Sequence, residues 1–177
     1  MYKLRELERK DIPIINTWRN DDSLISMLGA PFRYINSDVD FKWFDDYMLS
    51  RNNCVRCAIV TDECDDILGL VSLTNIDQLN QSAEFHIMIG RTESQGKGAG
   101  TFATTAILNH AFNNLNLHRI ELGVLPANTR AQRLYEKVGF IKEGIKRSSR
   151  YKNGSFVDVI QYGILKEEFM CTKLGGG

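Results

Sequence analysis

Apolar and polar residues alternate in several short segments of this 177-residue chain, and a period of two residues indicates half-buried β-strands. Strands are predicted at residues 2–7, 54–61, 67–74, 83–89, 118–125 and 156–165. The turn signal Lys152-Asn153-Gly154-Ser155 predicts a hairpin, so another strand precedes the last one.

Other segments carry apolar residues at helical spacing and predict helices at 10–20, about 38–49, about 100–113 and 129–138. Asp11 and Pro13 suit the start of the first helix, and Gly139 suits the end of the last. The order β-α-α-β-β-β-α-β-α-β-β indicates an α/β fold with a mixed sheet and helices on both faces. No linker or repeat interrupts it, so residues 1–170 are predicted to form one domain. Residues 171–177 are interpreted as a disordered tail or a remnant of cloning.

The composition of the chain favours a globular protein and argues against some classes of partner. Hydrophobic residues make up 43% and charged residues 25%, as is typical of a globular domain. The 22 Lys and Arg balance the 22 Asp and Glu, which argues against a nucleic-acid-binding protein. The start of the chain lacks the apolar core of a signal peptide, and no apolar run approaches a membrane span. We therefore expect a cytoplasmic protein with neither a nucleic acid nor a membrane as partner.

The four cysteines include a C-x-x-C pair, Cys54 and Cys57. A zinc site would need two more ligands, and Cys64 has no neighbouring histidine to supply one. A redox pair would favour a helix start, whereas this segment is predicted as a strand. Reduced thiols in a sheet are the favoured interpretation, and no metal is expected.

The most specific local signal is a glycine-rich turn. The predicted strand 83–89 leads into Gln95-Gly96-Lys97-Gly98-Ala99-Gly100-Thr101, which opens a helix. Glycines let the backbone approach a ligand closely, and the N–H groups of a helix start suit a pyrophosphate. Lys97 adds a cation. The spacing fits neither the G-x-G-x-x-G dinucleotide fingerprint nor a Walker P-loop, so another phosphate ligand is predicted.

A second segment indicates which ligand this turn binds. The stretch from Asn128 to Phe140, NTRAQRLYEKVGF, carries an asparagine, a helix with Ala131 and Tyr135, and a closing glycine. Together with Gln-x-x-Gly-x-Gly after a strand carrying Glu84, it resembles the Gcn5-related N-acetyltransferases (GNAT). The resemblance covers about residues 2–169. It is strongest from Ala83 to Phe140. Within the family, the segments at residues 115–120 and 153–158 resemble those of the ribosomal-protein alanine and spermidine acetyltransferase branches.

The resemblance implies a mostly antiparallel sheet of six to seven strands whose central strands splay to hold acetyl-CoA, the cosubstrate. The backbone of Ile87, Met88 and Ile89 would hold the pantetheine arm and supply an N–H for the developing oxyanion. The turn would bind the pyrophosphate. Asn128 would contact the pantetheine or position the thiol, unless it is simply a helix N-cap, and Ala131 would line the same site. Dimers are common in the family, so a homodimer is one expected assembly.

Two residues are candidates for proton transfer. Tyr135, protonated at neutral pH, would donate to the leaving thiolate as general acid; the alternative is an aromatic core residue. Glu84 would act as general base through a water; the alternative is a solvated strand carboxylate. His86, two residues along the strand, should face the same side as Glu84, as an assistant in proton transfer or as a structural histidine.

The amine acceptor is the least determined feature. Four acidic residues in the second helix would attract a polyamine or form a solvated helix face: Asp38, Asp40, Asp45 and Asp46. Arg19 and Arg33 would suit a phosphorylated or carboxylate-bearing acceptor instead. The activity expected is direct acetyl transfer to a primary amine of a small molecule or protein N-terminus. A polyamine acetyltransferase, an amino-sugar-nucleotide acetyltransferase (which Trp18-Arg19-Asn20 resembles) and a non-catalytic acetyl-CoA sensor are the alternatives.

Overall fold

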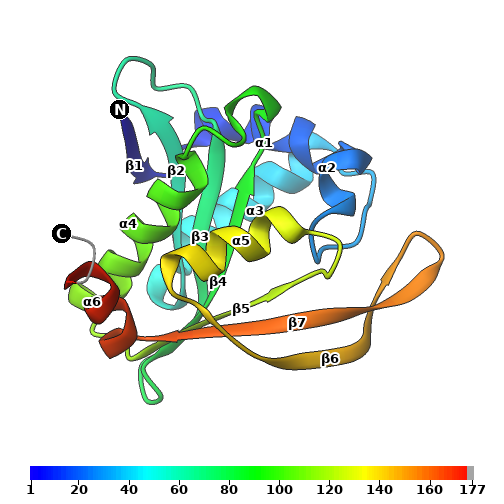
Figure 1. The fold of residues 1–177 in the computed structure, drawn as a ribbon. Helices are drawn as coiled ribbons and strands as arrows, with labels where there is room; N and C mark the ends of the chain where they lie inside the picture. Colours follow the sequence, from blue (N-terminus) through cyan, green and yellow to red (C-terminus); the bar gives the residue numbers. More distant parts are fainter. Residues whose placement is uncertain (175–177) are drawn as a thin grey trace.

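The computed structural model describes residues 1–174 and contains a seven-stranded sheet in the order β1-β2-β3-β4-β5-β7-β6 (Figure 1). The strands are β1 (Tyr2–Glu6), β2 (Val55–Thr61), β3 (Gly69–Asp77), β4 (Ser82–Ile89), β5 (Arg119–Val124), β6 (Ile141–Lys152) and β7 (Ser155–Leu165). The helices are α1 (Ile12–Arg19), α2 (Asp22–Ser26), α3 (Ser37–Leu49), α4 (Ala99–Asn113), α5 (Thr129–Val138) and α6 (Lys166–Leu174). The predicted mixed, mostly antiparallel sheet is confirmed.

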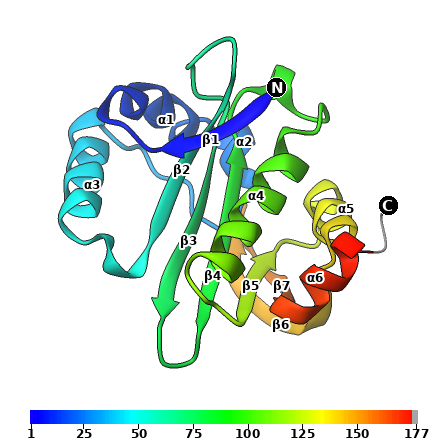
Figure 2. The same cartoon turned by 90° about the vertical axis from the view of Figure 1, so that its left-hand side faces the viewer.

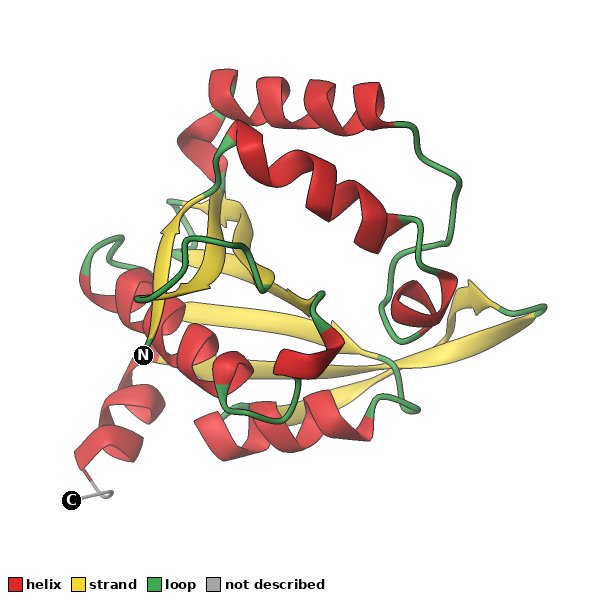
Figure 3. Cartoon of the chain, turned by 90° about the horizontal axis from the view of Figure 1, so that it is seen from above, coloured by secondary structure: helices red, strands yellow, loops and turns green. Residues whose placement is uncertain are grey.

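Helices cover both faces of the sheet (Figures 2 and 3). Helices α1 and α3 pack on one face, where Ile12, Trp18 and Phe44 meet Ala58 and Val60 of β2. Helices α4, α5 and α6 pack on the other face over a larger apolar core. Because successive strand residues point to opposite faces, β2, β3 and β4 contribute side chains to both cores. The sheet is therefore a wall between two helical layers.

Only β4 and β5 run parallel, and their pairing is short. It joins Ser82 to Arg119 and ends where Glu84 pairs with Glu121. Beyond that point β4 continues to Ile89 and β5 to Val124 without pairing to each other. Figure 1 shows β5, β7 and β6 turning away from the first four strands. The expected splay of the central strands is therefore present, and it leaves one edge of β4 open.

The turn chemistry of the later strands was predicted correctly. Asn153 and Gly154 both have positive φ, 50° and 84°, as a tight β6–β7 hairpin requires. Helix α5 has the predicted bounds and ends at Gly139, whose φ is 109°.

The structure adds detail that the sequence pattern did not contain. The five-residue α2 was missed, since it is too short to show helical periodicity. The tail predicted from residue 171 begins inside α6, which runs to Leu174, and residues 175–177 lie outside the described chain. Asp11 occupies the N-cap position of α1, but its side chain makes no capping bond to that helix.

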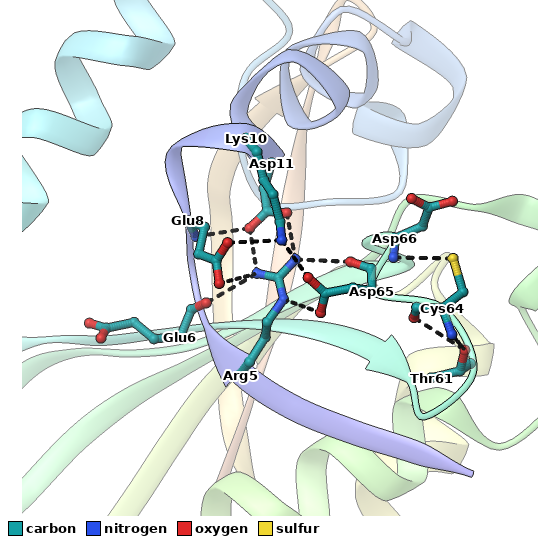
Figure 4. Close-up of polar contacts among 9 residues, drawn as sticks. All are labelled: Arg5, Glu6, Glu8, Lys10, Asp11, Thr61, Cys64, Asp65 and Asp66. Atoms are coloured by element: carbon teal, nitrogen blue, oxygen red, sulfur yellow. Dashed lines mark hydrogen bonds and ion pairs between the residues drawn. The ribbon is translucent and has the colours of Figure 1, made fainter.

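The Asp11 carboxylate instead binds a network that fixes α1 against the sheet (Figure 4). Its two oxygens accept hydrogen bonds from Arg5 of β1, both at 2.8 Å, and one also accepts from the backbone N–H of Glu8. Arg5 donates through Nε to Asp65 of the β2–β3 turn at 2.7 Å. A bidentate guanidinium pair is geometrically specific, so it sets the position of the α1 start.

Candidate active site

A cavity of about 770 Å³ passes through the gap between β4 and β5. Its wall includes Glu84, His86 and Met88 from one face of β4, and Phe85 and Ile87 from the other. Alternate residues of a strand point to opposite faces, so this cavity is open to both layers of the fold. Such a passage lets two reactants meet from opposite sides of the sheet.

The carboxylate of Glu84 and the imidazole of His86 are neighbours on the α1–α3 side. Glu84 Oε2 lies 3.6 Å from His86 Nε2, which is also 3.0 Å from the Thr74 hydroxyl oxygen. Desolvation in the cavity wall lowers the pKa of His86, although half of its side chain is exposed, and the Glu84 carboxylate partly opposes this. His86 is thus neutral at pH 7 and able to accept a proton. The prediction that it shares a side with Glu84 is confirmed.

Tyr135 of α5 reaches the same cavity from the opposite layer. Its ring packs edge-on against Phe85, with 6.0 Å between centroids, and against Phe140 at 5.7 Å. The residue is 7% exposed, and desolvation raises the pKa of its hydroxyl to about 12. Within residues 1–174 the hydroxyl has no hydrogen-bond partner. A protonated, uncommitted donor in an apolar wall is suited to a leaving group.

The predicted phosphate turn has the required backbone shape. Gly96 and Gly98 have φ of +80° and +93°, which side-chain-bearing residues rarely adopt. The first bond of α4 runs from Phe102 N–H to Gly98 C=O at 2.9 Å. The N–H groups of Ala99, Gly100 and Thr101 precede that bond and point out of the helix end. The turn therefore fits a pyrophosphate.

Two side chains, those of Gln95 and Arg130, interact at this turn. The Gln95 amide donates to the Ile89 carbonyl at 3.0 Å, and its oxygen accepts from Arg130 at 2.6 Å. Gln95 thus shapes the turn through its side chain. Arg130, missed in the sequence, places a guanidinium beside Gly96 and adds a cation to the exposed Lys97. Its position two residues after Asn128, at the start of α5, was the available signal.

Asn128 has the N-cap role, since its oxygen accepts from Ala131 N–H at 3.1 Å. Its amide nitrogen donates to the Met27 carbonyl at 3.0 Å and so holds the loop after α2. Of the predicted site residues, the cavity wall contains Glu84, Ile87, Met88, Asn128 and Tyr135. The structure places Ile89, residues 95–101 and Ala131 outside that wall, around the adjoining starts of α4 and α5. Contact of any of these residues with acetyl-CoA stays a prediction.

The acidic residues of α3 do not face the cavity. Asp40 is fully buried and pairs with Arg19 and with the Asn16 amide. Asp45 pairs with Arg9, and Asp46 with Lys42. The cavity wall includes none of Asp38, Asp40, Asp45 and Asp46, and Arg33 is also outside it. Arg19 does line the cavity.

Basic side chains line the cavity instead. Besides Arg19 these are Arg56 of β2 and Lys146 and Arg150 of β6, whereas its carboxylates are Glu84 and Glu121. Arg56, Lys146, Arg150 and Glu121 were not identified in the sequence, because only the pairing of the strands brings them together. A strongly acidic acceptor site, which the polyamine alternative predicts, is not formed by this wall.

The cysteine pair does not form a chemical site. Cys54 and Cys57 are free thiols, and desolvation raises the pKa of Cys57 to about 11, which keeps it protonated and poorly reactive. Across the described residues, no three His, Cys, Asp or Glu side chains are grouped so as to hold a metal ion. No helix of that part of the chain is long and apolar enough to span a bilayer.

Comparison with known proteins gives consistent matches. A family model for the acetyltransferase (GNAT) domain matches residues 2–141. The chain is 33% identical over 168 residues to a spermidine N(1)-acetyltransferase of Vibrio cholerae, and the alignment covers 94% of each protein. It is 35% identical over 107 residues to the putative ribosomal N-acetyltransferase YdaF of Bacillus subtilis, covering 60% of this chain and 58% of that protein.

Solved structures agree with these matches. A crystal structure of spermidine N-acetyltransferase from Vibrio cholerae, in complex with CoA and spermine, superposes with a TM-score of 0.89. The alignment has 31% sequence identity and covers 96% of this chain and 98% of that one.

Proposed function

Since the chain belongs to the GNAT family and is an acetyl-CoA-dependent N-acetyltransferase, we propose that the acetyl group moves directly to a primary amine inside the cavity between β4 and β5. The observation that carries this proposal is that one cavity connects Glu84 on one face of the sheet with Tyr135 on the other. The thioester would enter from the α4–α5 layer and the amine from the α1–α3 layer. Both reactants would then be bound at once, in a ternary complex.

The acetyl-CoA side is built from main-chain groups. The N–H groups at the start of α4, together with Lys97 and Arg130, would hold the pyrophosphate. The unpaired edge of β4 between Phe85 and Ile89 offers main-chain donors and acceptors to the pantetheine arm, as an added strand would use them. An N–H on this edge would stabilise negative charge on the thioester oxygen.

The acceptor side must remove a proton. A primary amine has an unperturbed pKa near 10 and arrives mostly as an ammonium ion. Glu84 attracts that ion and accepts its proton, directly or through a water, while the neutral His86 next to it passes the proton on to solvent. The free amine nitrogen then bonds to the acetyl carbon and becomes positively charged. It loses its second proton to Glu84, which His86 has by then deprotonated, as the amide forms.

Tyr135 completes the transfer. As the carbon–sulfur bond breaks, the electron pair stays on sulfur, and the Tyr135 hydroxyl donates its proton there. Burial raises the pKa of Tyr135, but the thiolate forms in the same apolar wall and is destabilised for the same reason. The tyrosinate recovers its proton from solvent after CoA departs.

Relatives suggest two acceptor classes, because some are named for spermidine and one for ribosomal acetylation. We propose to separate them by measuring thiol release from acetyl-CoA with spermidine, spermine, peptides beginning with Ala or Ser, and an amino-sugar nucleotide. Turnover of one class establishes direct transfer to that amine. A protein that binds acetyl-CoA but turns over none of these amines would point to the non-catalytic sensor instead.

We also propose a cellular compartment and a surface for dimer formation. The free thiols of Cys54, Cys57, Cys64 and Cys171 fit a reducing compartment such as the cytoplasm. A homodimer, if formed, would use β6, since β7 has partners on both edges and β6 ends the sheet with Ile141 and Ile145 exposed. Size-exclusion chromatography with light scattering tests the second proposal.

A further inference from the structure

We propose that the acceptor amine carries an anionic group, a carboxylate or a phosphate, and that Arg56 binds it. This inference rests on the proposed transfer site, since it concerns the molecule that meets Glu84 there. It makes Arg56 a residue that determines specificity.

Arg56 is a cation without an anion. Its guanidinium lies over the rings of Trp43, at 4.7 Å from the centroid, and Tyr47, at 5.7 Å. Among the described residues it makes no ion pair and no side-chain hydrogen bond, and its Nε is buried without a partner. Buried polar groups nearly always have partners, and an arginine offers five donors in a fork that matches a carboxylate or phosphate. The terminal N–H groups of Arg56 are therefore uncommitted donors at the cavity wall.

The aromatic packing holds Arg56 in place. Trp43 and Tyr47 belong to α3. Tyr47 is buried and donates to Glu6 at 2.8 Å, and Trp43 packs against the same core, so both rings have defined positions. A preordered guanidinium loses little conformational entropy when a ligand binds. The other cation near Trp43, Arg19, is already neutralised by the buried Asp40. Unlike Arg19, Arg56 is thus a cation of this wall without a charge partner among the described residues.

The sheet register sets the distance from Arg56 to the reaction centre. Arg56 pairs with Ser72 of β3, and Ser72 pairs with His86 of β4. Three residues in one row across adjacent strands share a face, and two strand spacings place Arg56 about 10 Å from His86, backbone to backbone. The side chains bridge part of that distance. An acceptor of a few bonds' length would therefore place its amine at Glu84 and its anion at Arg56.

The remaining charges agree with this orientation. The carboxylates of the wall, Glu84 and Glu121, lie opposite each other where β4 and β5 pair, which is where the ammonium is needed. Lys146 and Arg150 extend the cationic part of the wall on β6. A polyamine would place its second ammonium group next to these cations, which is unfavourable. An amine with an anionic group would place its ammonium next to the carboxylates and its anion next to the cations.

The test compares matched amines that differ in one anionic group. Glucosamine is compared with glucosamine 6-phosphate, butylamine with 4-aminobutyrate, and spermidine is the polycation. For each, kcat/KM is measured with wild type, Arg56→Met, Arg56→Lys and Lys42→Met. Methionine keeps the apolar stem of Arg56 without its charge, and Lys42 is an exposed cation of α3 outside the cavity.

We expect kcat/KM to be higher for the anionic member of at least one pair. Arg56→Met should lower that value by about tenfold to a hundredfold, mostly through KM, which corresponds to the loss of a charged hydrogen bond. The kcat/KM of the member without the anionic group should change less than twofold. Arg56→Lys should recover part of the loss, and Lys42→Met should have no effect. The phosphate pair and the carboxylate pair tell the two anions apart.

Equal kcat/KM within both pairs, or the highest kcat/KM for spermidine, would overturn the anionic acceptor while leaving the transferase intact. So would equal losses for both members of a pair in Arg56→Met. If no amine is turned over by a protein that binds acetyl-CoA, the transfer site itself fails, and this inference fails with it. Circular dichroism and acetyl-CoA affinity of each variant show whether it is folded.

Discussion

The Glu84 carboxylate lies 3.6 Å from Nε2 of His86, and both side chains project from the same face of β4. The carboxylate would favour the imidazolium, but desolvation prevails and lowers the pKa of His86 below its usual 6.5. The pair is therefore an anion next to a neutral base at pH 7. That is the arrangement needed to attract an ammonium ion and then take its proton.

The pKa of His86 should shift in opposite directions when its two charged neighbours, Glu84 and Arg56, are replaced one at a time. Removing the negative charge with Glu84→Gln should lower the pKa of His86 further, whereas removing the positive charge with Arg56→Met should raise it. NMR titration of the imidazole measures both shifts. Shifts of the same sign would contradict the geometry.

Glu84→Gln should also slow catalysis. Loss of a general base costs about 100- to 10,000-fold in rate, and the loss should be greatest at low pH, where more of the amine is protonated. Steady-state kinetics between pH 6 and 9 measures it. Glu63→Gln, in an exposed turn, is a control that should keep full activity. If Glu84→Gln lowers the rate by less than tenfold, another residue is the general base.

Tyr135→Phe should reduce kcat by about 100-fold or more and leave the affinity for acetyl-CoA nearly unchanged, because only the donated proton is lost. The matched control is Tyr162→Phe. Tyr162 also packs against Tyr135, but its hydroxyl donates to Glu136 at 2.8 Å and is not part of the cavity wall. Its loss should cost about 1 kcal/mol of stability and little activity. Equal falls in kcat and in acetyl-CoA affinity in Tyr135→Phe would exclude it as the acid.

Asp40→Asn should lower the free energy of unfolding by about 3 kcal/mol, because it leaves Arg19 without its buried partner. This is the low end of the range for buried pairs, since Arg19 is 32% exposed and can be hydrated. Asp46→Asn breaks an exposed pair with Lys42 on the same helix and should cost less than about 1 kcal/mol. Urea denaturation compares the two, and similar costs would show that the Arg19 pair is not structural.

The network around Arg5 should make stability depend on pH at the acidic end. Lys10 and Arg5 lower the pKa of Asp65 to about 2, against about 3.9 in an unfolded chain. A lowered carboxyl pKa stabilises the fold above pH 4 and loses that contribution as the pH falls to 2. The stability difference between wild type and Asp65→Asn should therefore shrink over this interval. A constant difference from pH 5 to 2 would show that Asp65 acts without its charge.

Lys152→Met should weaken acceptor binding from outside the reaction centre. Lys152 is buried and donates to the carbonyls of Ile25 and Ala30, at 2.9 and 2.7 Å, which holds the loop after α2 against the β6–β7 hairpin. Residues 27–31 of that loop line the cavity. We expect KM for the amine to rise several-fold at unchanged acetyl-CoA affinity. The exposed Lys142 of β6 provides the control substitution to methionine.

Much of the fold follows from local patterns, and the site does so only in part. Alternation and turn residues predicted all seven strands, and helix α5 was predicted with its exact bounds, because each signal is confined to a few neighbouring residues. The partners of Asp11 and Asp40 lie in other elements, so their roles could not be seen. The sequence gives no local signal for Arg56 either, because its position near His86 depends on how β2, β3 and β4 pair in the sheet. Glu84 and Tyr135 were selected because family motifs mark them, and His86 because it lies two residues after Glu84 on the same strand.

The position of β7 between β5 and β6 has a consequence for how the protein is made. A ribosome releases β6 before β7, but β6 has no partner in the sheet until β7 is in place. Until the last strand emerges, β5 presents a bare edge and Tyr135 lacks Tyr162 beneath its ring. Before β7 is made, the sheet around Tyr135 is therefore incomplete, and the open edge of β5 is a site for association with other growing chains. Assembly of the active site has to await the synthesis of β7.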